Sequence, residues 1–211
     1  MQRRSFLLHG SALLSGLAAG PLLTDEARAA GVVCGVGKDK RAKLKAERLT
    51  GQVQYVATEK DGSPVTRCWI ACVQMVFRYY GHNLPANKLR EEAYKGKVPN
   101  KPWEDLSPLK RVFTDDKGKK FNVVTENLAV RASDAAELLA DNQPLIIGAF
   151  GHPVLLTAMS YTGDRLGGMT LVDATVLDPT PGTGTRVVCS PDWVNVSFIS
   201  RIAVRKGGGK T

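Results

Sequence analysis

The sequence predicts an α+β fold in which helices come first and antiparallel strands follow. The segment from 68 to 81 places its apolar side chains on one helical stripe and ends at a glycine. Further along, short apolar runs alternate with clusters of turn residues, which is typical of antiparallel strands. Because the two patterns occupy separate halves of the chain, they indicate the α+β class.

The helix over 68–81 is predicted to be the core of the domain, with Gly81 as its C-cap. Its apolar stripe consists of Trp69, Cys72, Val73, Val76, Phe77 and Tyr80. A second helix is expected at about 85–94, and a third at 134–140 with Ser133 as its N-cap. Strands are expected at 144–150, 154–161 and 169–177. The stretch from the second helix to Lys120 has no clear pattern.

Residues 1–29 resemble a targeting signal rather than part of the fold. Residues 2–8, QRRSFLL, are similar to the twin-arginine export signal, and the small residues before Ala30 match the pattern that signal peptidase reads, so cleavage is expected after Ala29 or Ala30. The resemblance implies export of a folded protein by the twin-arginine translocase, to a bacterial periplasm or beyond. The apolar run at 11–23 is too short for a span of about 20 residues, so no stable membrane span is expected after cleavage; a retained anchor is the alternative.

The remaining chain is predicted to form one domain with two extensions. Residues 30–49 are a basic N-terminal arm, residues 50–204 form the folded domain, and residues 205–211 form a flexible tail that contains three consecutive glycines.

The chain is basic, with a formal net charge of +9. One basic cluster lies at 38–48, and the other comprises Lys110, Arg111, Lys117, Lys119 and Lys120. An acidic partner such as an anionic envelope polymer is therefore a candidate, and a solvated surface is the alternative. Neither cluster has aromatic residues spaced to stack bases, so a nucleic-acid partner is not expected.

The chain has four cysteines, Cys34, Cys68, Cys72 and Cys189. An even number predicts disulfides in an oxidising compartment. Cys68 and Cys72 are four residues apart on one helix, too far for a disulfide, and the pairing among Cys34, Cys72 and Cys189 stays open. No cysteine or histidine cluster has the spacing of a zinc site, and neither a metal nor an organic cofactor is expected.

Cys68 is the candidate nucleophile. At the start of the predicted helix, unpaired N–H groups and the helix dipole would favour a thiolate and lower the pKa of the thiol. A buried structural cysteine or a disulfide is the alternative. Cys72 faces the apolar stripe and is assigned a structural role.

His152 is the candidate general base. After signal cleavage the other histidine is His82, which the helix would hold about 20 Å from Cys68 at 1.5 Å per residue. If the strands around the turn at 163–168 form a hairpin, His152 lies opposite roughly residue 179. Asp178 is therefore predicted to orient the imidazole, in preference to Asp173.

These residues resemble the papain-like cysteine proteases. The likeness rests on Cys68-Trp69 in an aromatic-rich helix, Gly151-His152 at the start of a strand, and Asp178-Pro179. It covers about residues 50–182 and is closer to bacterial effector proteases and to the peptidase domains that remove double-glycine leaders. It implies a helical N-terminal half whose central helix bears the nucleophile and packs on a C-terminal antiparallel sheet. It also implies a Cys68, His152 and Asp178 triad that forms an acyl-enzyme.

One position departs from the family. The glutamine that usually precedes the nucleophile by about six residues and donates to the oxyanion is replaced by Gly62. Gln54 is the candidate oxyanion donor if the intervening loop makes an extra turn. The alternative is weakened or lost activity, since one oxyanion donor contributes about 100-fold to 1000-fold in rate.

The leading hypothesis is thus an exported thiol peptidase that acts on a peptide or isopeptide bond of a peptide or protein substrate. A cell-wall peptide amidase or acyl transferase with the same triad is a second hypothesis. A non-catalytic binding module on a papain-like fold is the third.

Overall fold

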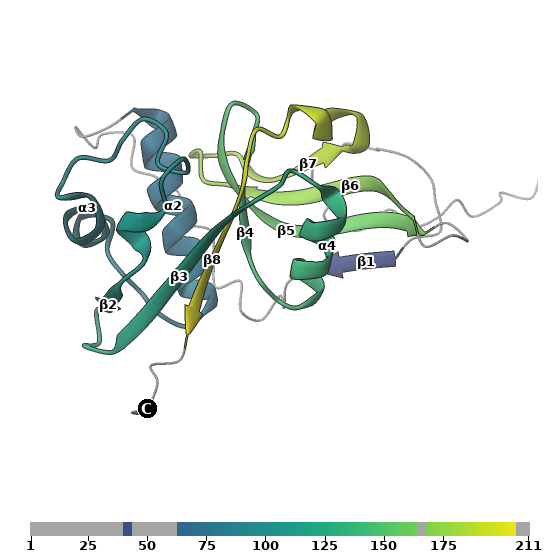
Figure 1. Ribbon diagram of the computed structural model, residues 1–211. Coiled ribbons are helices and arrows are strands. Elements are labelled where there is room, and N and C mark those ends of the chain that lie inside the picture. The colour runs from purple at the N-terminus through teal and green to yellow at the C-terminus, as the bar shows by residue number, and fades with distance from the viewer. Residues whose placement is uncertain (1–39, 44–62, 164–167, 206–211) are drawn as a thin grey trace, which may run out of the picture.

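The computed structural model describes residues 40–43, 63–163 and 168–205 (Figure 1). These residues form one antiparallel sheet with helices packed on it, so the predicted α+β class is confirmed. The predicted signal at 1–29, Gln54 and the tail beyond Arg205 lie outside the described residues. None of the helices in the described ranges is long and apolar enough to cross a membrane.

The central helix, α2, runs from Pro64 to Tyr79 and begins one turn earlier than predicted. Ser63 is the N-cap, and its hydroxyl oxygen accepts a hydrogen bond from the Thr66 N–H. Pro64 occupies the first helical position, where a backbone N–H would have no partner within the helix, so its missing N–H costs no hydrogen bond. The helix ends at Tyr79, and Tyr80, not Gly81 as predicted, is the C-cap; Gly81 follows it with a φ of 84°. Cys68 consequently lies in the second turn of α2 and not at its start.

The described residues also form two further α-helices and two short 3-10 helices. They are α3 (Ala86–Tyr94), α4 (Ala132–Ala140), η2 (Ser107–Leu109) and η3 (Ser190–Asn195). The prediction of Ser133 as the N-cap of α4 is wrong, because the helix already begins at Ala132 and Arg131 occupies the cap position. The Ser133 hydroxyl instead bonds the neighbouring Asp134 carboxylate.

Within the described ranges the sheet has eight strands, all paired antiparallel. The strands are β1 (Lys40–Lys43), β2 (Val112–Thr114), β3 (Lys120–Leu128), β4 (Leu145–Ala149), β5 (His152–Gly163), β6 (Met169–Asp178), β7 (Gly184–Cys189) and β8 (Ile199–Arg205). Their order is β2-β3-β8-β4-β5-β6-β7, and β1 pairs with β5. Four residues of the predicted arm therefore belong to the sheet. β2 lies in the stretch without a clear sequence pattern, and β3, which was not predicted, follows it.

The centre of the sheet is covered on both faces. On β4, Ile146 points toward the cluster built around α2 and α3, whereas Leu145 and Ile147 point toward the cluster that contains α4. All five residues of β4 are buried, which explains its continuous apolar sequence. Figure 1 shows α2 and α3 side by side at one end of the molecule and α4 beside β1. The helix that carries Cys68 thus packs against the strand that begins with His152.

Candidate active site

His152 and Asp178 meet at one end of the β5–β6 hairpin. The register pairs Leu155 with Leu177, so the start of β5 lies beside the end of β6. The His152 Nε2 atom is 2.9 Å from the Asp178 Oδ1 atom. Asp173 pairs with Ser160 further along the hairpin. The structure therefore brings His152 together with Asp178 and not with Asp173, as the hairpin arithmetic predicts.

A tight turn fixes the position of His152. Phe150 and Gly151 connect β4 to β5 and have φ angles of 55° and 80°. Positive φ at both central residues is typical of a type I′ turn, which matches the twist of the strands on either side. This conformation is unfavourable for phenylalanine, so the turn stores local strain next to the candidate base.

Asp178 is fully buried and fully hydrogen-bonded. Its Oδ1 atom accepts bonds from His152 and from the Thr180 N–H at 2.9 Å, and its Oδ2 atom accepts one from Arg186 Nη1 at 3.0 Å. Burial by itself would raise the pKa of the Asp178 carboxyl, but the hydrogen bonds from His152, Thr180 and Arg186 hold it well below its usual range. The carboxylate is therefore ionised at neutral pH.

Arg186 joins Asp178 to the turn of His152. The guanidinium carbon lies 3.4 Å from the centre of the Phe150 ring, while Nη1 donates to Asp178. Arg186 was not predicted from the sequence. It lies on the short strand β7, which pairs with β6 and was not predicted either. Arg186 thus contacts both the exposed Phe150 ring and the carboxylate that bonds the imidazole.

The second ring nitrogen of His152 also faces an oxygen. Its Nδ1 atom is 3.2 Å from the Phe150 carbonyl. The ring can donate to this carbonyl and to Asp178 at once only when both nitrogens carry protons. Before Nδ1 can accept a proton from another group, its contact with the Phe150 carbonyl must break.

Cys68 is linked to Asp178 through Thr180. The thiol is 2 % exposed, and the Thr180 side chain lies within hydrogen-bonding reach of both the thiol and the Asp178 carboxylate. Burial raises the pKa of the Cys68 thiol to about 11, the Thr180 bond lowers it, and the negative charge of Asp178 raises it. The expected lowering of this pKa is wrong, because burial of the thiol dominates and Cys68 lies beyond the free N–H groups of the first turn of α2.

The cysteines have separate states. Cys68 and Cys72 are both free, as expected for two residues four apart on a helix, whereas Cys189 takes part in a disulfide. The Cys72 thiol donates to the Pro153 carbonyl at 3.5 Å, next to His152 in the sequence. This contact holds α2 against the start of β5.

A cavity of about 320 Å³ adjoins the His152 turn. It is lined by Ala149, Phe150, Gly151, Val188, Asp192 and Asn195. Asp192 is the one charged side chain in that lining, and it lies on η3. The cavity thus lies on the histidine side of the candidate site.

The other sequence candidates lie elsewhere. His82 follows α2 and pairs with Asp115, away from the strand end that carries Asp178. Gln54 falls outside the described residues. Within the described ranges, no group of three or more histidine, cysteine or acidic residues could hold a metal ion.

Comparison with known proteins identifies no family for this chain. No family model matches the chain, and no curated protein matches it. A crystal structure of UfSP from C. elegans is similar, with a TM-score of 0.47 and 10 % sequence identity over 83 % of this chain and 36 % of that chain. The chain spans about a third of the length of that structure. A likeness of this size carries no argument about fold, activity or substrate.

Proposed function

We propose that this protein is an exported papain-like thiol peptidase with Cys68 as nucleophile, His152 as general base and Asp178 as the orienting acid. The observation that carries the proposal is the contact of His152 with the buried Asp178, with Nε2 and Oδ1 2.9 Å apart, near a free thiol that shares Thr180 with the same carboxylate. Acyl transfer by a thiol requires a nucleophile, a base and a group that orients the base. The proposal assigns these roles to Cys68, His152 and Asp178.

The reaction begins from a neutral thiol, because a pKa of about 11 keeps Cys68 protonated at neutral pH. As sulfur attacks the acyl carbon, the thiol proton passes to His152 Nδ1. The ionised Asp178 stabilises the imidazolium through Nε2. The imidazolium then gives its proton to the leaving amine, and a water molecule, deprotonated by His152, hydrolyses the thioester.

Export to the periplasm or beyond belongs to the same proposal. The disulfide at Cys189 supports it, since disulfides persist in oxidising compartments. Cleavage after Ala29, passage through the twin-arginine translocase and a role for Gln54 in the oxyanion hole rest on the sequence alone.

One observation favours a second candidate function. The Cys68 thiol is buried and its pKa is raised, as for a structural cysteine, which is what a non-catalytic binding module would show. A cell-wall peptide amidase would use the same three residues on another substrate. An acyl transferase would use them to pass the acyl group to an acceptor other than water.

Covalent labelling by the papain-family inactivator E-64 tests the proposal. The protein from residue 30 onward is treated under mild reduction, and the adduct is located by intact mass and peptide mapping. Labelling of Cys68, and its loss in His152→Ala, supports an activated pair. The matched control is Cys72→Ser, which keeps a donor to the Pro153 carbonyl and should leave labelling of Cys68 in place. If neither E-64 nor small alkylating reagents modify Cys68, the binding module becomes the better conclusion.

A further inference from the structure

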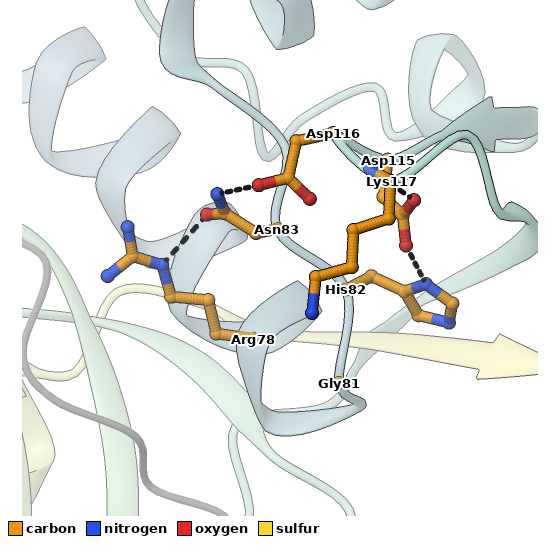
Figure 2. A pocket seen from close by; sticks show the side chains of 7 residues that line it. All are labelled: Arg78, Gly81, His82, Asn83, Asp115, Asp116 and Lys117. Carbon is orange, nitrogen blue, oxygen red and sulfur yellow. Dashed lines mark hydrogen bonds and ion pairs between the residues drawn. The ribbon is translucent and has the colours of Figure 1, made fainter.

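A second cavity, of about 390 Å³, lies where the end of α2 meets the β2–β3 turn (Figure 2). It is lined by Arg78, Gly81, His82, Asn83, Asp115, Asp116 and Lys117. None of these residues takes part in the proposed peptidase site. The lining includes Lys117, a member of one of the two basic clusters in the sequence.

The turn that carries Lys117 is held in place by the Asp115 side chain. Asp115 Oδ2 accepts from the His82 ring at 2.9 Å, and Asp115 Oδ1 accepts from the N–H groups of Lys117 at 3.0 Å and Lys119 at 2.8 Å. The His82 ring stacks on Phe121 with centroids 4.2 Å apart. The hydrogen bond from His82 lowers the pKa of Asp115, so the carboxylate is ionised and holds the turn in place.

The opposite wall is fixed by Asn83. Its Oδ1 atom accepts from Arg78 Nε at 3.2 Å, its Nδ2 atom donates to Asp116 at 2.6 Å, and its carbonyl accepts from the Asp116 N–H at 3.0 Å. Figure 2 shows these bonds running across the cavity from the arginine to the aspartate. Arg78 is thereby held by one nitrogen while its two terminal nitrogens stay available.

The unused donors in the cavity are cationic. Within the part of the chain that the structure describes, the terminal nitrogens of Arg78 and the Lys117 ammonium bond to no protein group, and Figure 2 shows the ammonium without a partner among the lining residues. Gly81 leaves open space where a Cβ atom would stand. The exposed residues Lys119 and Lys120 follow on the same turn and strand.

We propose that this cavity binds a side-chain carboxylate of an acidic polypeptide segment. A guanidinium presents paired donors that match a planar carboxylate, and Lys117 adds a second positive charge. Asp116 stands in the same wall, and its charge disfavours a phosphate group, which carries up to two negative charges. The site therefore favours a singly charged anion, and it operates independently of Cys68.

Binding of fluorescently labelled poly-L-glutamate tests this proposal by anisotropy at low and at physiological salt. Lys117→Gln is expected to weaken binding about threefold to tenfold, and Arg78→Gln by a similar factor, as for the loss of one exposed charge pair. Lys97→Gln is the matched control, because it removes the same charge at an exposed position outside the cavity. It should change affinity less than twofold. Lys117 makes no side-chain bond within the described residues, so its variant tests the site without disturbing the fold.

Three outcomes would overturn the proposal. Wild-type protein that does not bind poly-L-glutamate at low salt has no such site. Equal losses in Lys117→Gln and Lys97→Gln would mean that only the overall charge attracts the polymer. Tighter, Arg78-dependent binding of inorganic polyphosphate would show that the cavity selects phosphate and not carboxylate.

Discussion

Asp178 accounts for the local arrangement of the candidate site. One buried carboxylate orients the imidazole, anchors Arg186 and lies within reach of the Thr180 hydroxyl that contacts Cys68. Each donor bonds a charge that is removed from water, so each bond is of the stronger, charge-assisted kind. The roles proposed for Cys68 and His152 therefore depend on this residue.

We expect Asp178→Asn to lower the free energy of unfolding by roughly 2 kcal/mol at neutral pH, the size of a hydrogen bond to a charged group. Because the native pKa is depressed, the ionised carboxylate stabilises the fold above the unfolded pKa of about 3.9, and this stabilisation is lost as pH falls through the native pKa. The difference between wild type and variant should be constant from about pH 5 to pH 8 and shrink below pH 4. Urea unfolding at a series of pH values measures it. Asp141→Asn, at an exposed position, should show no such trend.

The alkylation rate of Cys68 should rise about tenfold per pH unit from pH 6 toward pH 11. The raised pKa means that the thiolate, which is the reactive species, is a small fraction throughout this range. Iodoacetamide modification followed by peptide mapping separates Cys68 from the fully buried Cys72. A rate that is already constant between pH 5 and pH 8 would contradict the neutral thiol and indicate a preformed ion pair with His152.

Arg186 should act as a positioning residue for the same pair. Arg186→Gln removes the donor to Asp178 Oδ2 and the cation over Phe150, so E-64 labelling of Cys68 should slow about tenfold, equivalent to one hydrogen bond to a charge. The pH dependence of labelling should shift as well, which a purely structural defect would not cause. Arg186→Lys restores the charge and should recover part of the rate. Labelling that is unchanged in rate and pH profile would rule out this role.

At the scale of elements, α2 shows what periodicity can and cannot predict. Its apolar stripe and its glycine end are visible in the sequence because both are local. Its start was misplaced because the segment before Cys68 carries no apolar repeat. The pair Ser63-Pro64, an N-cap residue followed by proline at the first helical position, is the signal that places the start correctly. That single turn removes the helix N-terminus as a cause of a lowered Cys68 pKa, and burial of the thiol raises the pKa instead.

The β4–β5 turn should be sensitive to the residue at its second position. Gly151 has a φ of 80° with open space around it, so Gly151→Ala meets no clash but forces a β-carbon into left-handed backbone. We expect a loss of about 1 kcal/mol in the free energy of unfolding, read from guanidinium titration. Phe150→Asn is the comparison, because asparagine tolerates this conformation and should keep the turn intact. Equal stability of Gly151→Ala and wild type would contradict the turn geometry.

At the scale of the molecule, the sequence predicts the centre of the fold better than its periphery. Strands β4, β5 and β6 are recognisable because burial makes their apolar residues continuous. Strands β3 and β7 have many half-exposed positions and therefore no clear alternation. Asp178 could be matched to His152 because one hairpin connects them. The contacts of Arg186 and Thr180 with Asp178 could not be predicted, because they depend on how β7 and the chain after β6 fold back to the site.

The numbers of free and disulfide-bonded cysteines are a property of the whole chain, and the free thiols can be counted by titration. Two thiols in α2 are free, and Cys189 is in a disulfide, so denatured, unreduced protein should show two reactive thiols, and reduced protein four. Reduction should also lower the free energy of unfolding by about 2–4 kcal/mol, because the disulfide restricts the unfolded chain. Thiol titration with a chromogenic disulfide and urea unfolding with and without reductant measure both quantities. Cys189→Ser should match the reduced stability and still label at Cys68, because Cys189 lies at the far end of β7 from Gly184, the residue that pairs with Asp178. Four reactive thiols before reduction would contradict the disulfide and, with it, its support for an oxidising destination.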